Sequence, residues 1–223
     1  MAKPRGLNVV VLGPPGAGKT TQAWRLAQHE RVPLASAGDL LREQVRAGTA
    51  VGKTVEPYLT QGKLVPDECI MQLLRQRLAS PDVDRGFVLD GFPRTLGEAD
   101  ALDEFLREIQ HPLTHVLLLQ VPDAMALDRL RGRLVCPDCG SVFHARHDPP
   151  VPGAVCSVCR TVIHVTHDGR LQCGACREPI SARPDDRPPG HPGAPTGVPL
   201  RHGAGARVLS KPGSPAGRRW ERH

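Results

Sequence analysis

Aromatic residues are scarce in this chain, which has four Phe, two Trp and one Tyr among 223 residues. After residue 133 only Phe143 and Trp220 remain. Proteins that hold single-stranded nucleic acid stack bases on aromatic side chains set in a basic groove. The scarcity therefore argues against a nucleic-acid partner, although the formal net charge is +6.

A long apolar run is also missing at the N-terminal end. The short run at Leu7–Leu12 stops at Gly13-Pro14-Pro15, so it is too short for a signal peptide's apolar region or a membrane span. We therefore expect a cytoplasmic protein with no membrane partner. Seven Cys in a reducing compartment argue against a disulfide framework. Six of them form Cys-x-x-Cys pairs, a spacing typical of metal sites.

The positive charge is concentrated in residues 184–223, which hold seven Lys or Arg against three acidic residues. The same 40 residues contain eight Pro and seven Gly and show no hydrophobic period. Such a composition cannot bury enough apolar surface to form a core. We expect this tail to be disordered or non-native.

The rest of the chain alternates short apolar runs with segments of helical period. Strands are expected at Leu7–Leu12, Leu34–Ser36, Gly86–Asp90 and His115–Val121, and helices at Lys19–His29, Asp39–Ala47, Gly52–Gln61, Asp67–Ala79, Thr95–Ile109 and Asp123–Arg133. This rhythm predicts an α/β fold, with a mainly parallel sheet covered on both faces. We expect a core over residues 1–133, a Cys-rich module over 134–183 and the tail over 184–223.

A phosphate-binding loop stands out between the first strand and the first helix. Gly13-Pro-Pro-Gly-Ala-Gly-Lys19-Thr20 fits the pattern G-x-x-x-x-G-K-[ST] in the context that its mechanism requires. Its glycines let backbone N–H groups face a triphosphate, and the following helix N-terminus favours anions. Lys19 is expected at the β- and γ-phosphates, and Thr20 or Thr21 near Mg²⁺.

Five stretches in this order resemble adenylate kinases, within the wider group of nucleoside-monophosphate kinases. They are GPPGAGKTTQA at 13–23, SAGDLLR at 36–42, GKLVPDE at 62–68, GFVLDGFPRT at 86–95 and the Cys-rich segment, which is similar to the zinc-bearing lid of long bacterial members. The resemblance implies a parallel-sheet P-loop core, a helical monophosphate-binding domain over about 36–65 and a zinc-knuckle lid. It implies the reaction ATP + AMP ⇌ 2 ADP with Mg²⁺, and a monomer.

The resemblance also assigns roles to residues. It implies catalytic roles for Lys19, Asp90, Arg94, Arg129, Arg133 and Arg183. It implies ATP binding by Gly13, Gly16, Ala17, Gly18, Lys19, Thr20, Thr21, Arg133, Val142 and Phe143. It implies monophosphate binding by Ala37, Arg42, Lys63, Leu64, Val65, Gly91, Phe92, Pro93, Arg94, Glu98 and Arg183. The chemistry agrees, because phosphoryl transfer depends on positioning and on neutralising charge, for which the Arg fork is suited.

Three of these residues have further support from their expected places. If the helix from Asp123 runs to Arg133, then Arg129 and Arg133 lie four residues apart on one face. Asp90 ends a predicted strand, where ligands bind in open α/β sheets.

Two substrate-site positions depart from the family pattern. Ala37 stands where adenylate kinases usually have Thr, and Glu98 where they usually have Gln. Glu98 can accept a hydrogen bond from the adenine amino group, but an ionised carboxylate cannot donate one to a ring nitrogen. SAGDLLR is similar to the corresponding stretch of UMP/CMP kinases, so a pyrimidine monophosphate is the alternative substrate.

The lid has one Cys pair more than a single zinc ion needs. Cys136, Cys139, Cys156 and Cys159 are the favoured ligands of one structural Zn²⁺. Cys173 and Cys176 stand at the family's spacing from Arg183-Pro-Asp-Asp, so they are an alternative second pair. A second site with His164 or His167 is a further alternative.

The tail departs from the family most. The family continues with a helix carrying a further catalytic Arg, a strand and a final helix, whereas Ala194 stands near the expected Arg position. The abrupt change of composition resembles a shifted reading frame. We therefore expect impaired turnover. Two alternatives come from other classes of protein. A zinc-knuckle nucleic-acid module on a P-loop domain is disfavoured because the cysteines occupy the kinase lid position between Arg133 and Arg183. A P-loop hydrolase or motor leaves SAGDLLR and GFPRT unexplained.

Overall fold

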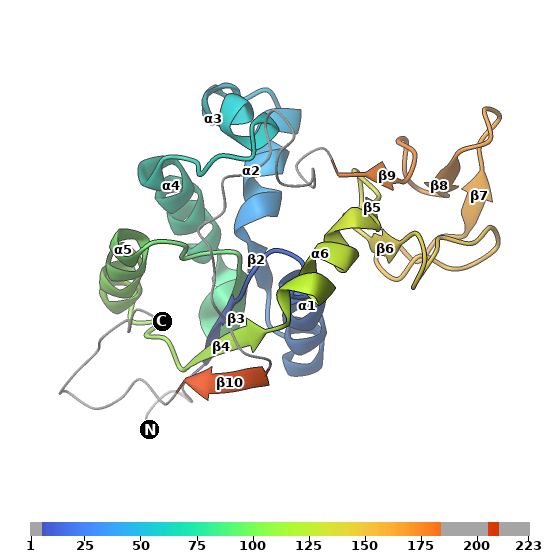
Figure 1. The fold of residues 1–223 in the computed structure, drawn as a ribbon. Helices are drawn as coiled ribbons and strands as arrows, with labels where there is room; N and C mark the ends of the chain where they lie inside the picture. Colours follow the sequence, from blue (N-terminus) through green and yellow to red (C-terminus); the bar gives the residue numbers. More distant parts are fainter. Residues whose placement is uncertain (1–5, 184–204, 210–223) are drawn as a thin grey trace. The chain divides into compact units, whose positions relative to one another are not determined.

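The computed structural model describes residues 6–183 and the strand at 205–209 (Figure 1). These residues divide into two compact units. The first comprises 6–59, 63–122 and 205–209, and the second comprises 60–62 and 123–183.

The first unit is built on a five-stranded sheet in the order β10-β4-β1-β3-β2. Its strands are β1 (Leu7–Leu12), β2 (Leu34–Ser36), β3 (Gly86–Asp90), β4 (His115–Gln120) and β10 (Gly205–Leu209). The first four strands are parallel, with β1 between β3 and β4 at the centre. The α/β class and the parallel sheet expected from the sequence are therefore confirmed.

The apolar runs form strands because both faces of the sheet are covered. Val9, Val11 and Val88 face one way and pack with Ala23 and Ala27 of α1 (Lys19–Glu30). The alternate residues Val10, Phe87 and Leu89 belong to a larger cluster on the other face. This alternation is the period of two that a strand imposes on its side chains.

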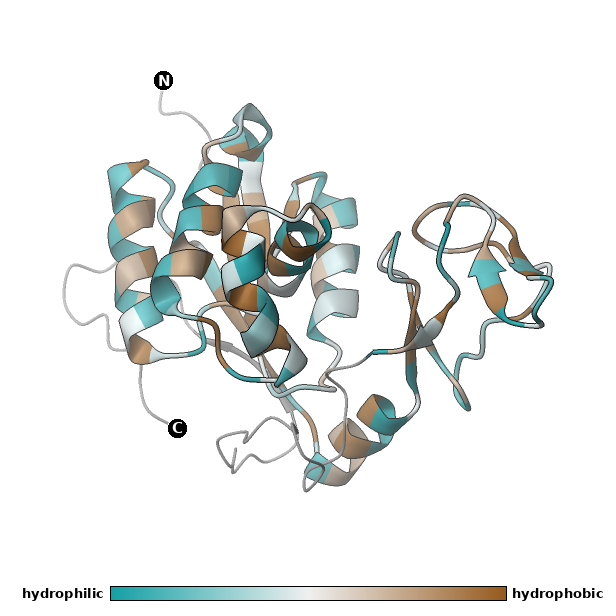
Figure 2. Ribbon diagram, turned by 90° about the horizontal axis from the view of Figure 1, so that it is seen from above, coloured by the Kyte–Doolittle hydropathy of each residue, from teal (hydrophilic) through white to brown (hydrophobic). Residues whose placement is uncertain are grey.

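Four helices contribute to the larger cluster: α2 (Ala37–Arg46), α3 (Ala50–Thr60), α4 (Asp67–Leu78) and α5 (Leu96–Glu108). A short 3₁₀ helix at Pro81–Arg85 leads into β3. Figure 2 shows these helices banded with hydrophilic and hydrophobic residues, as expected of helices with one face on a core. Among the residues described, no helix is both long and apolar enough to cross a membrane.

The strand β10 differs from the expectation that the tail forms no strand. Gly205–Leu209 pairs antiparallel with β4, so that Ala206 stands opposite Leu119. The physical reason is that β4, paired to β1 on one side, offers backbone N–H and C=O groups on the other. The remainder of the tail, including Ala194, lies outside the described residues.

The second unit begins with α6 (Asp123–Arg131) and continues in short antiparallel strands. One sheet has the order β6-β5-β9, with β5 (Arg133–Val135), β6 (Val142–His144) and β9 (Ser181–Ala182). A two-stranded sheet joins β7 (Ile163–Val165) to β8 (Leu171–Cys173). The absence of helical period after residue 133 thus corresponds to small β-hairpins.

The placing of Arg129 and Arg133 on one helix face was wrong. Helix α6 ends at Arg131, and Arg133 is the first residue of β5. Gly132, between the two elements, is a poor helix former, and its carbonyl oxygen accepts a hydrogen bond from Ala145 N at 2.7 Å instead of from a further turn of helix. The His144 ring lies against this glycine, where an added Cβ would come within 2.2 Å of the ring.

Candidate active site and metal centre

The loop between β1 and α1 has the backbone that its glycines predict. Gly13, Gly16 and Gly18 have φ angles of 145°, 81° and 90°. At Gly13 a Cβ would lie 2.5 Å from the carbonyl oxygen of Leu119, so a close approach as well as φ requires glycine. Such conformations turn successive N–H groups into one anion-binding concavity.

The start of α1 favours a bound anion. Gly18 is its N-cap and provides no side-chain cap, and the first turn contains no acidic residue. The positive end of the helix dipole is therefore not neutralised by the helix itself. Lys19 is the first helical residue, and its Nζ donates to the carbonyl oxygen of Pro14 within the loop at 2.9 Å.

Asp90 connects this loop to the end of β3. Thr20 Oγ1 donates to Asp90 Oδ2 at 2.6 Å, and only 3% of Asp90 is exposed. Its other oxygen, Oδ1, is buried and has no hydrogen-bond partner among the described residues. Burial raises the pKa of Asp90, while the Thr20 hydrogen bond and the Lys19 charge act in the opposite direction.

An unsatisfied buried carboxylate oxygen needs an explanation such as an absent ion or water. Mg²⁺ prefers oxygen ligands and keeps several of its waters. Asp90 and the Thr20 hydroxyl therefore fit a hydrated Mg²⁺ beside the phosphate loop.

A pocket in the same unit contains most of the expected monophosphate-binding residues. It is lined by Ala37, Leu41, Leu64, Val65, Ile70, Gly91, Phe92, Arg94 and Glu98. Ala37 directly follows β2 and Gly91 directly follows β3, as Gly13 directly follows β1. The pocket and the loop thus lie at the carboxyl ends of three parallel strands, where open α/β sheets bind ligands.

Glu98 has a structural role that the sequence interpretation missed. Its Oε2 accepts hydrogen bonds from the backbone N–H groups of Arg94 and Thr95. Thr95 Oγ1 in turn accepts from Glu98 N at 3.1 Å, which completes a capping box at the start of α5. The spacing T-x-x-E was the available signal. Burial raises the pKa of Glu98, and the two backbone hydrogen bonds oppose the shift.

The cations around the pocket are held by their own elements. Arg42 Nη2 lies 2.6 Å from Asp39 Oδ1 on α2. Arg94 is exposed, and its Nε donates to the carbonyl oxygen of Gly91 at 2.9 Å. Pro93 is buried and follows a cis peptide bond from Phe92, whereas Lys63 is exposed.

The expected lid cations belong to the second unit. Arg129 lies on α6 and Arg133 starts β5. Leu134 pairs with Ala182 across β5 and β9, so Arg183 follows at the same end of the strand pair as Arg133. The structure thereby brings together two arginines that are far apart in the sequence. Val142 and Phe143, on β6, pair with β5.

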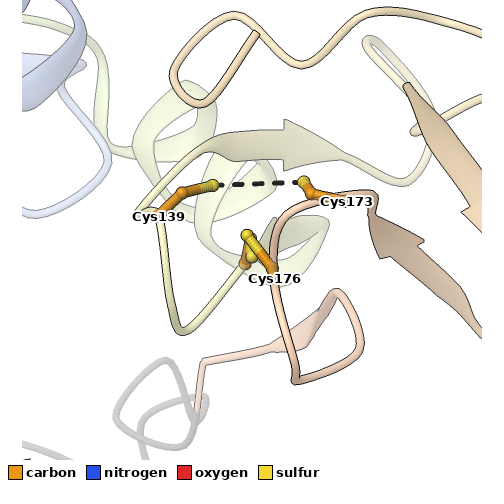
Figure 3. Close-up of side chains that lie close together, drawn as sticks. Cys139, Cys173 and Cys176 are labelled. Atoms are coloured by element: carbon orange, nitrogen blue, oxygen red, sulfur yellow. Dashed lines mark hydrogen bonds between the residues drawn. The ribbon is translucent and has the colours of Figure 1, made fainter. Parts of the chain in front are cut away.

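All six paired cysteines pack in one cluster of the second unit. Two groups of four thiols form, each with its sulfur atoms within 4.8 Å of one another: Cys136, Cys139, Cys173 and Cys176, and Cys139, Cys156, Cys159 and Cys173. The favoured set from the sequence is not such a group among the described residues, because Cys136 does not join Cys156 and Cys159. Figure 3 shows Cys139, Cys173 and Cys176 with their sulfurs turned toward one another.

The thiols influence one another's ionisation. Burial opposes ionisation of Cys156, but hydrogen bonds from Ser141 and around Cys159 outweigh it and lower its pKa to about 6. Burial and neighbouring thiols raise the pKa of Cys173 and Cys176. Only deprotonated thiols bind zinc, so binding here would release protons. All seven cysteines of the chain are free, with no disulfide in the cluster.

The phosphate loop and the pocket at the neighbouring strand ends are typical of a nucleotide-binding α/β protein. A family model described as adenylate kinase matches residues 11–186. The adenylate kinase of Desulfitobacterium hafniense is 42% identical over 166 residues, which cover 74% of this chain and 76% of that protein. The adenylate kinase of Moorella thermoacetica is 44% identical over 181 residues, covering 81% and 75% respectively.

A third relative, the adenylate kinase of Archaeoglobus fulgidus, is 45% identical over 144 residues, which cover 65% of this chain and 66% of that protein. The chain belongs to the adenylate kinase family, and it is a nucleoside-monophosphate kinase.

Proposed function

We propose that the protein catalyses reversible transfer of the γ-phosphoryl group of ATP to AMP, giving two ADP. The observation that carries this proposal is the placement of a phosphate loop and a pocket of monophosphate-site residues at the carboxyl ends of β1, β2 and β3. A hydrolase would need the loop but no second nucleotide pocket beside it.

In this reaction Lys19 neutralises charge on the β- and γ-phosphates, and the loop backbone holds them. Thr20 and Asp90 would hold a hydrated Mg²⁺, which would supply positive charge to neutralise the phosphates. Arg42 binds the phosphate of AMP, and Arg94 stabilises the charge on the phosphoryl group in transfer. Because the transition state is loose, these residues act by alignment and electrostatic stabilisation.

Arg129, Arg133 and Arg183 of the second unit are proposed to supply the remaining cations at the phosphoryl group. Val142 and Phe143 are proposed to contact the ATP base. Exclusion of water during transfer would prevent hydrolysis of ATP.

Initial rates of ADP formation from ATP with AMP, UMP, CMP or GMP test the substrate. We expect the highest kcat/KM with AMP. A preference for UMP or CMP would instead support the pyrimidine alternative that Ala37 and Glu98 raise. ATP hydrolysis at the same rate with no monophosphate present would exclude kinase function for this site.

We also propose a structural Zn²⁺ in the second unit, held by Cys136, Cys139, Cys173 and Cys176. The support is the mutual approach of these four sulfurs within 4.8 Å. Four thiolates leave no open coordination position, so this zinc stabilises the fold and takes no part in the chemistry. Loss of secondary structure in the second unit on chelation would agree with this role.

Turnover is proposed to be low, because a further Arg expected after residue 187 is replaced near Ala194, outside the described residues. Replacing residues 188–223 with the matching C-terminal segment of the Moorella thermoacetica relative tests this. We expect kcat to rise by about 10³-fold or more, on the scale of an arginine finger. Equal kcat in the two proteins would contradict the proposal.

A further inference from the structure

One structural zinc ion leaves two thiols of the cluster without a function. With Cys136, Cys139, Cys173 and Cys176 around one ion, Cys156 and Cys159 remain. Cys156 is fully buried and Cys159 is half-buried, and both pack in the same cluster as the other four cysteines. Two further thiols, one fully and one partly buried in the same cluster as a zinc site, need an explanation.

The Cys156–Cys159 pair is folded as a metal-binding knuckle. Cys136 N donates to the carbonyl oxygen of Ser141 at 3.0 Å, and Gly140 N donates to that of Cys136 at 2.9 Å. The second pair repeats this pattern, with Cys156 N to Thr161 O at 2.8 Å and Arg160 N to Cys156 O at 3.1 Å.

The second turn places an arginine in a backbone conformation that favours glycine. Gly140 has a φ of 74°, and Arg160 at the equivalent position of the second turn has a φ of 59°. Glycine adopts this conformation freely, whereas a residue with a long side chain adopts it rarely. The second pair therefore keeps the knuckle conformation even where its own sequence disfavours it.

Two cysteines, Cys139 and Cys173, belong to both four-thiol groups. The sulfur atoms of Cys139 and Cys173 lie 4.0 Å apart, as the dashed line in Figure 3 marks. Cys139 Sγ is also 3.8 Å from Cys156 Sγ, on the side of the second group. A tetrahedral site with Zn–S bonds of about 2.3 Å has sulfur atoms about 3.8 Å apart, so both distances fit zinc coordination.

We propose that the six cysteines bind two zinc ions as one binuclear cluster, in which the thiolates of Cys139 and Cys173 bridge the ions. Cys136 and Cys176 complete the first tetrahedron, and Cys156 and Cys159 complete the second. The proposal rests on the single zinc site proposed above and adds a second ion to it. Six thiolates with two Zn²⁺ carry the same net charge as four thiolates with one Zn²⁺, so the second ion adds no net charge to the buried cluster.

Zinc content of the purified full chain, measured by inductively coupled plasma mass spectrometry, tests the stoichiometry. We expect two zinc ions per chain. One ion per chain would overturn the binuclear cluster and leave the single site intact. No bound zinc would overturn both proposals, so the two failures are distinguishable.

Zinc K-edge X-ray absorption on the unmodified protein tests the bridge without any substitution. We expect an all-sulfur first shell and a zinc–zinc contribution at a distance below about 4 Å. Two ions with nitrogen or oxygen ligands, or with no short zinc–zinc distance, would overturn the proposal.

Substitutions then separate the two halves. Cys156→Ser with Cys159→Ser should leave one zinc per chain, and Cys136→Ser with Cys176→Ser should do the same in chains that remain folded by circular dichroism. The group of Asp128, His144 and His147, in the same unit, also brings possible ligand atoms together. His147→Ala is therefore the matched control, and it should keep both ions. Loss of one ion in this control, or retention of two in Cys156→Ser/Cys159→Ser, would overturn the assignment.

Discussion

Thr20 Oγ1 donates a hydrogen bond of 2.6 Å to Asp90 Oδ2, which joins the phosphate loop to the carboxyl end of β3. The two residues lie 70 positions apart in the chain, and the parallel pairing of β1 with β3 brings them together. A carboxylate buried in this way is disfavoured by its own desolvation, so its presence beside the phosphate loop indicates a role in binding rather than in stability.

Asp90→Asn should therefore separate stability from activity. We expect kcat to fall by about 10- to 100-fold, as for residues that orient a metal's ligands. Because the neutral amide removes the desolvation of a buried charge, the free energy of unfolding should be unchanged or raised by up to about 2 kcal/mol. Steady-state rates and urea unfolding measure the two effects.

The exposed Asp100→Asn is the control for Asp90→Asn and should alter neither quantity. If Asp90→Asn lowered the free energy of unfolding as well as kcat, Asp90 would be a structural residue. Because the pKa of Asp90 is raised in the folded protein, its contribution to the free energy of unfolding falls as pH rises through that pKa. The Asn variant should lack this pH dependence.

Glu98→Gln should lower the KM for AMP. The amide provides the donor that an ionised carboxylate lacks, and it can still accept the N–H groups of the capping box. We expect a threefold to tenfold decrease, about the value of one net hydrogen bond. Glu98→Ala removes both functions and should cost about 1 kcal/mol of stability by loss of the cap. An unchanged KM in Glu98→Gln would show that this side chain does not contact the base.

Gly132→Ala should destabilise the second unit. The added methyl group would lie 2.2 Å from Cε1 of His144, whose Nδ1 accepts hydrogen bonds from the backbone of Arg146 and His147. Overpacking of this kind costs about 1 to 3 kcal/mol. Adding His144→Ala should recover part of this loss of stability. Thermal unfolding of the single and double variants measures the relief, and a double variant no more stable than Gly132→Ala would refute the contact.

Asp128 should make the second unit sensitive to acid. The hydrogen bond from His147, at 2.8 Å, together with the charge of Arg146 holds the pKa of Asp128 below its ordinary value. Its stabilising contribution is therefore present above the unfolded pKa and is lost as pH falls through the folded pKa. Asp128→Asn should show a weaker fall in stability below about pH 4. Identical acid unfolding curves for the two proteins would contradict this.

The parts of the molecule set by local sequence could be predicted closely. The strand Leu7–Leu12, the glycine loop and the start of α1 at Lys19 occur where the apolar run, the φ requirements and the spacing indicate. The pocket residues could be named because their motifs occur in a known order. Glu98 was read only as a contact to the base, although the same carboxylate caps a helix.

Features set by tertiary packing could not be predicted. Helix α6 ends at Arg131, where the carbonyl oxygen of the next residue, Gly132, accepts a hydrogen bond from Ala145 on a later turn of the chain. Three similar Cys-x-x-Cys pairs carry no local signal of which thiols meet, since this depends on how β7 and β8 return the chain to the first knuckle. The pairing of β10 with β4 likewise depends on a sheet edge distant in sequence.

The pairing of Leu134 with Ala182 has a consequence for how this segment can vary. The two strands β5 and β9 lie side by side, so the chain between them forms a loop with paired ends. The entropic cost of closing such a loop rises only slowly with its length. An additional knuckle can therefore be inserted without moving the two ends of the loop. The chain between β5 and β9 can therefore differ in length by whole turns while the Leu134–Ala182 pairing stays in place.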